Sequence, residues 1–156
     1  MGPRPRALVP GYSCPMRAFA ILTGPLVDEA GAVRQGWLIN LKDAYMPTKW
    51  KEARFRHGLF GGGMEPGETP GETCARELAE ELPGWPAPSL SELDTPGTVH
   101  RYVLGRVDLG LASFRAAMRA CEEGVPFVVD EEWIQRTVES DWLAPEMRAV
   151  LLATRG

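Results

Sequence analysis

The sequence has few residues of the kinds that build zinc sites and disulfide frameworks. Its 156 residues include three cysteines, Cys14, Cys74 and Cys121, and two histidines, His57 and His100. The cysteines are odd in number, widely spaced and form no CxxC pair, which argues against a structural zinc site and against a disulfide framework. This usage is typical of a reducing compartment, so we expect a cytoplasmic protein whose cysteines lie in the core.

A long apolar run and an excess of positive charge are also missing. The apolar stretch at 18–27 is interrupted by Thr23, Gly24 and Pro25 and is too short to span a bilayer. The formal net charge of −4 and the pI near 5.3 provide no broad positive field for a nucleic-acid backbone. We therefore expect no membrane segment and no long nucleic acid as a partner. Small phosphorylated molecules stay open, because bound cations can reverse the charge that a ligand meets.

The apolar content is sufficient for one core. Hydrophobic residues make up 44% and charged residues 24% of the chain, as in an ordinary globular domain. Residues 1–16 hold four prolines and little apolar pattern. We expect a flexible arm over 1–16 and a single domain over 17–156.

The apolar spacing predicts strands and helices in mixed order, which indicates an α/β fold. Residues 18–27 and 33–41 are typical of two strands joined by a turn, and 98–109 of a further strand. Residues 44–57 suit an exposed loop, whereas 130–139 and 145–154 have the spacing of closing helices. Residues 113–121 fit a helical face and an alternating strand equally well, so both assignments stay open.

A further helix is predicted from about 70 to 82 by the residues at its ends. Thr69 can cap its start, Pro70 suits the first helical position, and Glu72 completes a capping box with Thr69. At the other end, Pro83 disfavours helix at residue 82, and Gly84 permits the left-handed turn that often follows.

Three carboxylates share one face of this helix. At 100 degrees per residue, Glu77, Glu80 and Glu81 fall within an arc of roughly 100 degrees. The apolar residues 74, 75, 78, 79 and 82 occupy a different side, which suits the core. Helical glutamates are usually an ordinary solvated face. However, clustered like charges destabilise a helix, and a hard cation such as Mg²⁺ would offset this.

A longer pattern around the acidic face decides in favour of function. Gly62 is followed by five residues and Glu68, and then by seven residues and the run Arg-Glu-Leu-Ala-Glu-Glu at 76–81. Six fixed positions would match by chance with a probability on the order of 10⁻⁷ at average residue usage. The segment resembles the signature of the Nudix hydrolase family. It departs from that signature at Pro83, where the family carries a glycine, and this affects the turn after the helix.

The resemblance implies a fold and a metal site. The fold would be a mixed β-sheet sandwiched between helices (α/β/α). Glu77, Glu80 and Glu81 would bind Mg²⁺, for which Mn²⁺ can substitute, together with the carbonyl of Gly61. Arg76 and Glu68 would position the glutamates, and Glu77 is a candidate base. Metal-bound water would then attack phosphorus.

Residues outside the signature are weaker candidates. Glu122 or Glu123 would supply the additional acid that often helps in this family, although a solvated turn explains them equally well. The candidate substrate contacts are Lys49, Trp50, Arg56 and Tyr102. Exposed cations usually bind nothing specific, and packing is the commoner role of aromatic residues that could stack a base.

The expected activity is Mg²⁺-dependent cleavage of a diphosphate linkage in a nucleoside diphosphate derivative, with a nucleoside triphosphate-type substrate preferred. Dinucleoside polyphosphates, ADP-ribose and nucleotide sugars are alternatives, because variable loops choose among them. A non-catalytic nucleotide-binding module is a second alternative. Isomerisation of an isoprenoid diphosphate is a third, but it would need a thiol that faces the metal, and Cys74 falls on the core side. A homodimer stays open.

Overall fold

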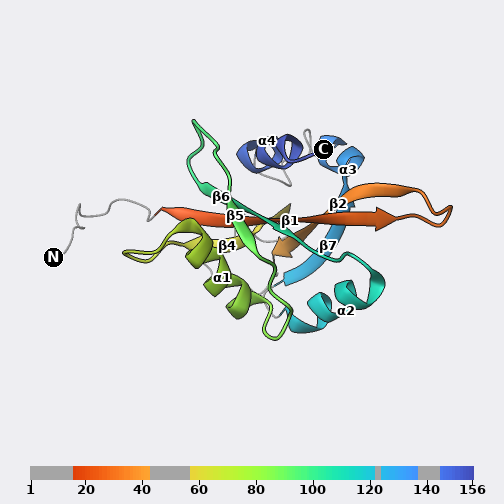
Figure 1. Cartoon of the computed structure of the whole chain (residues 1–156), viewed down its shortest axis with the longest axis horizontal. Helices are drawn as coiled ribbons and strands as arrows, with labels where there is room; N and C mark the ends of the chain where they lie inside the picture. The colour runs from red at the N-terminus through yellow and green to blue at the C-terminus, as the bar shows by residue number, and fades with distance from the viewer. Residues whose placement is uncertain (1–15, 43–56, 122–123, 137–144) are drawn as a thin grey trace.

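Residues 16–42, 57–121, 124–136 and 145–156 are described by the computed structural model. They form a seven-stranded mixed sheet with helices on both faces (Figure 1). The strands are β1 (Arg17–Val27), β2 (Val33–Lys42), β3 (His57–Gly58), β4 (Phe60–Gly63), β5 (Leu90–Glu92), β6 (Arg101–Arg106) and β7 (Gly124–Asp130). The helices are α1 (Pro70–Glu81), α2 (Leu111–Ala120), α3 (Glu131–Arg136) and α4 (Pro145–Ala153).

Strand β1 organises the sheet. Its first part, from Arg17 to Ala20, pairs antiparallel with β4, and its second part, from Leu22 to Val27, pairs antiparallel with β2. Strand β6 runs parallel to β1 along the opposite edge, and β5 follows β6. Because β4 and β2 share one edge of β1, the glycine-rich β4 lies next to the end of β2.

The two faces of β1 bury two separate cores, as its alternating side chains require. Ala18, Ala20 and Leu22 pack in a cluster with residues of α1 and α2. Phe19 and Ile21 pack in a second cluster with residues of α3 and α4. Figure 1 shows α1 and α2 on one side of the sheet and α3 and α4 on the other. The predicted α/β/α sandwich is confirmed.

Several predicted elements are confirmed, and one ambiguity is resolved. The hairpin is β1–β2, and the closing helix at 145–154 is α4. The ambiguous segment at 113–121 falls within and just after helix α2, where Phe114, Ala117 and Cys121 pack in the core beneath α1 and α2. Helical spacing therefore prevailed there because it presents one continuous apolar side to the sheet.

Other predictions need correction. The strand predicted at 98–109 is shorter, since β6 covers only Arg101–Arg106, and Val99 is 73% exposed. The helix predicted from residue 130 begins at Glu131, because Asp130 ends β7 and its carboxylate accepts a hydrogen bond from the Trp133 amide at 2.9 Å. Strands β3, β4, β5 and β7 were not predicted; three of them have no more than four residues.

Three predictions fall wholly or mainly outside the described residues: the arm at 1–16, the loop at 44–57, and the helix beyond residue 136. Among the helices that the structure describes, none is both long and apolar enough to cross a membrane.

Candidate active site

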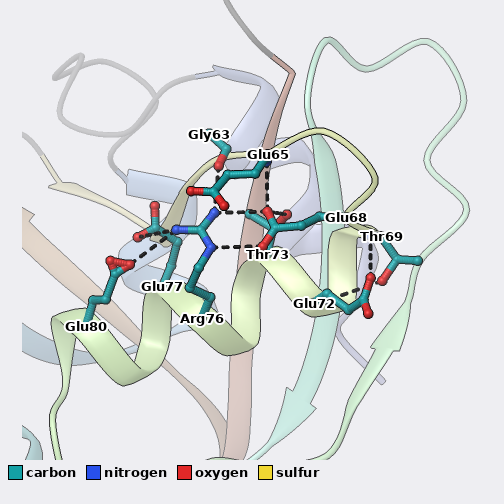
Figure 2. A network of polar contacts seen from close by, with 9 residues as sticks. All are labelled: Gly63, Glu65, Glu68, Thr69, Glu72, Thr73, Arg76, Glu77 and Glu80. Atoms are coloured by element: carbon teal, nitrogen blue, oxygen red, sulfur yellow. Dashed lines mark hydrogen bonds and ion pairs between the residues drawn. The ribbon is translucent and has the colours of Figure 1, made fainter. Parts of the chain in front are cut away.

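Helix α1 begins with the capping box that the sequence predicts. The Thr69 side chain accepts a hydrogen bond from the Glu72 amide at 3.2 Å, and the Glu72 carboxylate accepts one from the Thr69 amide at 2.9 Å (Figure 2). At its other end Leu82 caps the helix, and Gly84 has a φ of +79°, the left-handed turn expected after Pro83. Both ends of the helix are therefore fixed by local chemistry.

The rotation of α1 about its axis is set by its apolar side. Cys74, Leu78 and Leu82 are 0 to 2% exposed and pack against β1 and β4 residues in the core. Burial raises the pKa of the Cys74 thiol to about 12, with smaller contributions from Glu77 and Glu81. The cysteine is therefore a core residue, as predicted, and the acidic residues face away from that core.

Arg76 is the centre of a polar cluster on α1, which we call the Arg76 cluster: Glu68, Arg76, Glu77, Glu80 and the Gly63 carbonyl. Its guanidinium binds both carboxylate oxygens of Glu68, at 2.9 and 3.0 Å. It also donates to the Gly63 carbonyl at 3.0 Å and to the Glu80 carboxylate at 3.2 Å (Figure 2). The Glu77 carboxylate lies 3.8 Å away. Arg76 thus joins the loop before α1, the strand β4 and the acidic face.

Glu68 has the most complete set of partners in this cluster. Besides Arg76, its carboxylate accepts hydrogen bonds from the Glu65 amide and the Thr73 hydroxyl, both at 2.8 Å. The hydrogen bonds from Arg76 are the largest cause that lowers the pKa of Glu68, to about 2. In turn, Glu68 raises the pKa of Arg76. This pair is therefore charged throughout the physiological range and positions the loop against the helix.

The glycines of β4 bring the chain close to the acidic face. The Gly61 amide donates to the Glu81 carboxylate at 3.0 Å. Gly61 has a φ of +152°, and a Cβ there would overlap the Ala18 carbonyl of β1. A Cβ at Gly62 would overlap the Glu77 carboxylate, which occupies that space. A side chain at Gly61 would collide with the backbone of β1, whereas one at Gly62 would displace the Glu77 carboxylate, so both positions favour glycine.

These contacts test whether the predicted metal ligands suit a divalent cation. Three carboxylates along one face, next to a glycine-rich strand, supply the hard oxygen donors that Mg²⁺ prefers. The Glu80 side chain is 55% exposed and its carboxylate turns to Arg76. In the part of the chain that the structure describes, no three acidic, histidine or cysteine side chains converge closely enough to hold a metal ion. The donor types therefore suit Mg²⁺, but the described side chains do not converge on one point.

Tyr102 does not occupy the position predicted for a substrate contact. It is 1% exposed, and its hydroxyl donates to the Glu146 carboxylate at 2.6 Å. Its ring packs in the core on the side of α3 and α4, at 6.2 Å from the ring of Phe19, so the base-stacking role is not supported. The other predicted residues outside the signature, Lys49, Trp50, Arg56, Glu122 and Glu123, lie outside the described residues.

Two polar residues were missed by the sequence analysis. Thr73 is fully buried and donates to Glu68. Glu146 of α4 accepts hydrogen bonds from the Tyr102 hydroxyl and from the amides of Val99, at 2.6 Å, and His100, at 3.2 Å. We call this group the Glu146 cluster. Burial alone would raise the pKa of Glu146, but these hydrogen bonds outweigh burial and lower it. Of these two residues, only Thr73 could have been noticed in the sequence, because it lies one helical turn after the Thr69 cap.

A separate cavity of about 700 Å³ lies at the other end of β1 and β2. Thr23, Arg34, Gln35, Arg106 and Asp108 are among its lining residues. None of the signature residues lines it, so its position does not bear on the acidic face.

Solved structures share this fold at low sequence identity. A mutT/nudix family protein from Listeria innocua has a TM-score of 0.54 and 16% identity, covering 79% of this chain and 84% of that one. The Nudix hydrolase RenU from M. smegmatis has a TM-score of 0.52 and 18% identity, covering 89% and 82%. A MutT protein from Methanosarcina mazei Go1 has a TM-score of 0.51 and 16% identity, covering 90% and 95%. No protein-family model and no curated protein matches the sequence. At this identity the comparisons show the fold and not the activity.

Proposed function

We propose that this chain, which has the fold of Nudix proteins, is a Mg²⁺-dependent hydrolase that cleaves a diphosphate linkage in a nucleoside triphosphate-type or related nucleotide. One observation carries the proposal. The acidic face of α1 lies directly against the glycines of β4, with Glu81 on the Gly61 amide and Glu77 in the space that a side chain at Gly62 would fill. This arrangement supports a site in which backbone and carboxylate oxygens act together.

The residues that would hold the metal are Glu77, Glu80, Glu81 and the Gly61 carbonyl. Mn²⁺ should substitute for Mg²⁺, because both favour carboxylate and carbonyl oxygens. A bound cation would acidify and orient a water molecule and neutralise charge on the departing phosphate.

The chain's own residues then have distinct tasks. Arg76 would hold the acidic face in register with β4, because it contacts Gly63 and Glu80 together. Glu68 would keep the guanidinium in place through its two-pronged ion pair. Glu77 is our candidate for the base that receives the proton of the attacking water. Its side chain is 18% exposed, against 55% for Glu80, and its carboxylate lies against Gly62 of β4.

A phosphate-release screen tests the proposal. Nucleoside triphosphates, dinucleoside polyphosphates, ADP-ribose and nucleotide sugars would each be incubated with the protein, with Mg²⁺, with Mn²⁺ and with chelator. We expect release from at least one class that depends on the divalent cation. Nucleotide binding without release in every class would instead favour the non-catalytic module.

The remaining expectations stay proposals alongside this one. They are the additional acid at Glu122 or Glu123, the substrate contacts at Lys49, Trp50 and Arg56, a homodimer, and a cytoplasmic location.

A further inference from the structure

Thr73 is a polar residue in the buried part of helix α1. Its side chain is 0% exposed, and its hydroxyl donates a hydrogen bond to the Oε1 atom of Glu68 at 2.8 Å (Figure 2). Alanine is a better helix former than threonine, and a buried hydroxyl needs a partner to offset the loss of water. A small apolar residue would therefore suit this position, so the hydroxyl needs an explanation beyond packing.

The direction of this hydrogen bond is unusual for a threonine inside a helix. Such hydroxyls commonly donate to a carbonyl three or four residues earlier in the same helix. The Thr73 hydroxyl instead donates to Glu68, which lies in the loop before α1. The bond therefore connects the helix to the loop that leads into it.

Thr73 lies on the side of α1 that carries the charged residues. Arg76 follows it by three residues, Glu77 by four and Glu80 by seven, which is the spacing of one helix face. Thr73 is the buried beginning of this face, and the side chains of Glu77 and Glu80 are progressively more exposed. Because the Thr73 side chain has no exposed surface, any effect on the site must pass through a neighbouring residue.

The neighbour that Thr73 restrains is the Glu68 carboxylate. The last torsion of a glutamate side chain has a broad energy profile, so the plane of the carboxylate is set by its partners. The Oε1 atom accepts from the Glu65 amide, the Thr73 hydroxyl and Arg76, and the Oε2 atom accepts from Arg76. The donors from Glu65 and Thr73 hold Oε1 from the loop and from the helix. They align both oxygens for the two-pronged contact with the guanidinium.

Arg76 extends this alignment to the acidic face. Its guanidinium also donates to the Glu80 carboxylate at 3.2 Å and to the Gly63 carbonyl at 3.0 Å. Because a guanidinium is planar and rigid, a rotation of the Glu68 carboxylate would tilt all of these contacts together. The Thr73 hydroxyl is therefore connected to a proposed metal ligand by two ion pairs in series.

We propose that Thr73 is a positioning residue, whose hydroxyl holds Glu68 in the orientation that lets Arg76 keep the acidic face in place for Mg²⁺. The inference rests on the proposed function and adds to it a residue outside the fixed positions of the signature. The role belongs to the hydroxyl and not to the volume of the side chain.

Two substitutions separate the hydroxyl from the packing. Thr73→Val keeps the shape of the side chain and removes the hydroxyl, whereas Thr73→Ser keeps the hydroxyl and removes a methyl group. The Mg²⁺ affinity, measured by calorimetric titration without nucleotide, should be about fivefold weaker in Thr73→Val, which is part of the effect of one hydrogen bond to a charged group. In Thr73→Ser it should stay within about twofold of the wild type. The kcat for the nucleotide found in the screen should follow the same order, with the KM for that nucleotide unchanged.

Thr23→Val is the matched control, since it also removes a buried hydroxyl. Thr23 is 1% exposed, and its hydroxyl donates to the Gly36 carbonyl at 2.7 Å and accepts from Gln35 at 2.9 Å. It lines the cavity at the other end of β1. Both valine variants should lower the melting temperature, but only Thr73→Val should weaken Mg²⁺ binding and lower kcat.

A double-mutant cycle tests the route through Glu68. In a Glu68→Ala background the hydroxyl has no carboxylate to hold, so adding Thr73→Val should change the Mg²⁺ affinity by less than about twofold. Losses that add in the double variant would show that Thr73 does not act through Glu68.

The outcomes separate this inference from the proposed function. An undiminished Mg²⁺ affinity in Thr73→Val, or a loss in Thr73→Ser as large as in Thr73→Val, would overturn the positioning role. A wild type that binds Mg²⁺ but hydrolyses no nucleotide would contradict the proposed activity alone, because the Mg²⁺ affinities of the variants still decide the role of Thr73. A wild type that binds no Mg²⁺, with or without nucleotide, would contradict both.

Discussion

Two clusters of carboxylates connect separate elements of this fold, and they differ in charge. In the Glu146 cluster, one carboxylate accepts three hydrogen bonds from neutral donors, namely the Tyr102 hydroxyl and the amides of Val99 and His100. In the Arg76 cluster, Glu68, Glu77 and Glu80 surround one guanidinium. Three carboxylates and one guanidinium sum to a formal charge of −2, and the adjacent Glu81 makes it −3.

The difference in charge supports the division that we propose, in which the Glu146 cluster is structural and the Arg76 cluster is functional. The donors to the Glu146 carboxylate lie in β6 and in the segment before it. Their hydrogen bonds connect α4 to this part of the sheet, which is a structural role. The Arg76 cluster concentrates negative charge along one helix face, an arrangement that destabilises an isolated helix. Such an arrangement is consistent with a ligand that brings positive charge. Each test below changes one cluster and measures both activity and stability.

The largest expected effect comes from the acidic face. Glu81→Gln should lower turnover by roughly 10² or more, because the amide is a poor ligand for a hard cation, while the fold survives. Steady-state kinetics with the substrate found in the screen would measure this. Glu72→Gln is the control on the same helix, since glutamine also completes a capping box and should keep full activity. Equal activity in both variants would remove Glu81 from the site.

Gly62→Ala should have the next largest effect. The new Cβ would displace the Glu77 carboxylate, which is the far end of a flexible side chain, so we expect about tenfold lower turnover with a folded protein. Gly71→Ala makes the same change within α1, where a Cβ meets only the Thr69 hydroxyl oxygen, at 4.0 Å. That control should keep its activity and gain stability, since alanine favours helix. Unchanged turnover in Gly62→Ala would mean that the position of Glu77 is unimportant.

Glu146→Ala should act on stability alone. It leaves the buried Tyr102 hydroxyl and two amides without their acceptor, which costs about 2 kcal/mol of unfolding free energy. Urea unfolding measures the loss, and Tyr102→Phe, which removes only one of the three donors, should cost less. A large fall in kcat for Glu146→Ala with normal stability would show that the two clusters are not divided as we describe.

The smallest effect is the pH dependence from Glu68. Its pKa is lowered from an ordinary value of 4.5 to about 2, first of all by the hydrogen bonds from Arg76. The ionised carboxylate therefore stabilises the fold fully above about pH 4.5, and this contribution is lost as the pH falls toward 2. Urea unfolding would give the free energy of unfolding between pH 2 and pH 6, in steps of about 1 pH unit. Toward low pH, this free energy should fall less steeply in Glu68→Gln than in the wild type. The same pH dependence in both proteins would contradict the ion pair.

The sequence predicted elements whose signals are local. The ends of α1 depend on Thr69, Glu72 and Gly84, and the β1–β2 hairpin depends on alternation within one continuous segment. The short strands β3, β4 and β5 carry no such signal, because two to four residues cannot show a period. Strand β7 was missed because its burial follows no alternation: Val125 is exposed, Val129 is buried, and Phe127 and Val128 between them are half-buried.

The candidate site was predictable in its residues and less so in its contacts. The resemblance to the Nudix signature implied that Glu68 and Arg76 act together, and they form an ion pair at 2.9 Å. The burial of Tyr102 was not predictable, because its partner Glu146 lies 44 residues away in the sequence.

The most direct test of the central claim is a calorimetric titration of the protein with Mg²⁺, without nucleotide. The account predicts binding by the wild type and by Glu72→Gln with similar affinity, and at least about tenfold weaker binding by Glu81→Gln, since one ligand to the ion is lost. The same affinity in all three proteins, or no binding by the wild type with or without nucleotide, would contradict the assignment of the acidic face of α1 as a metal site.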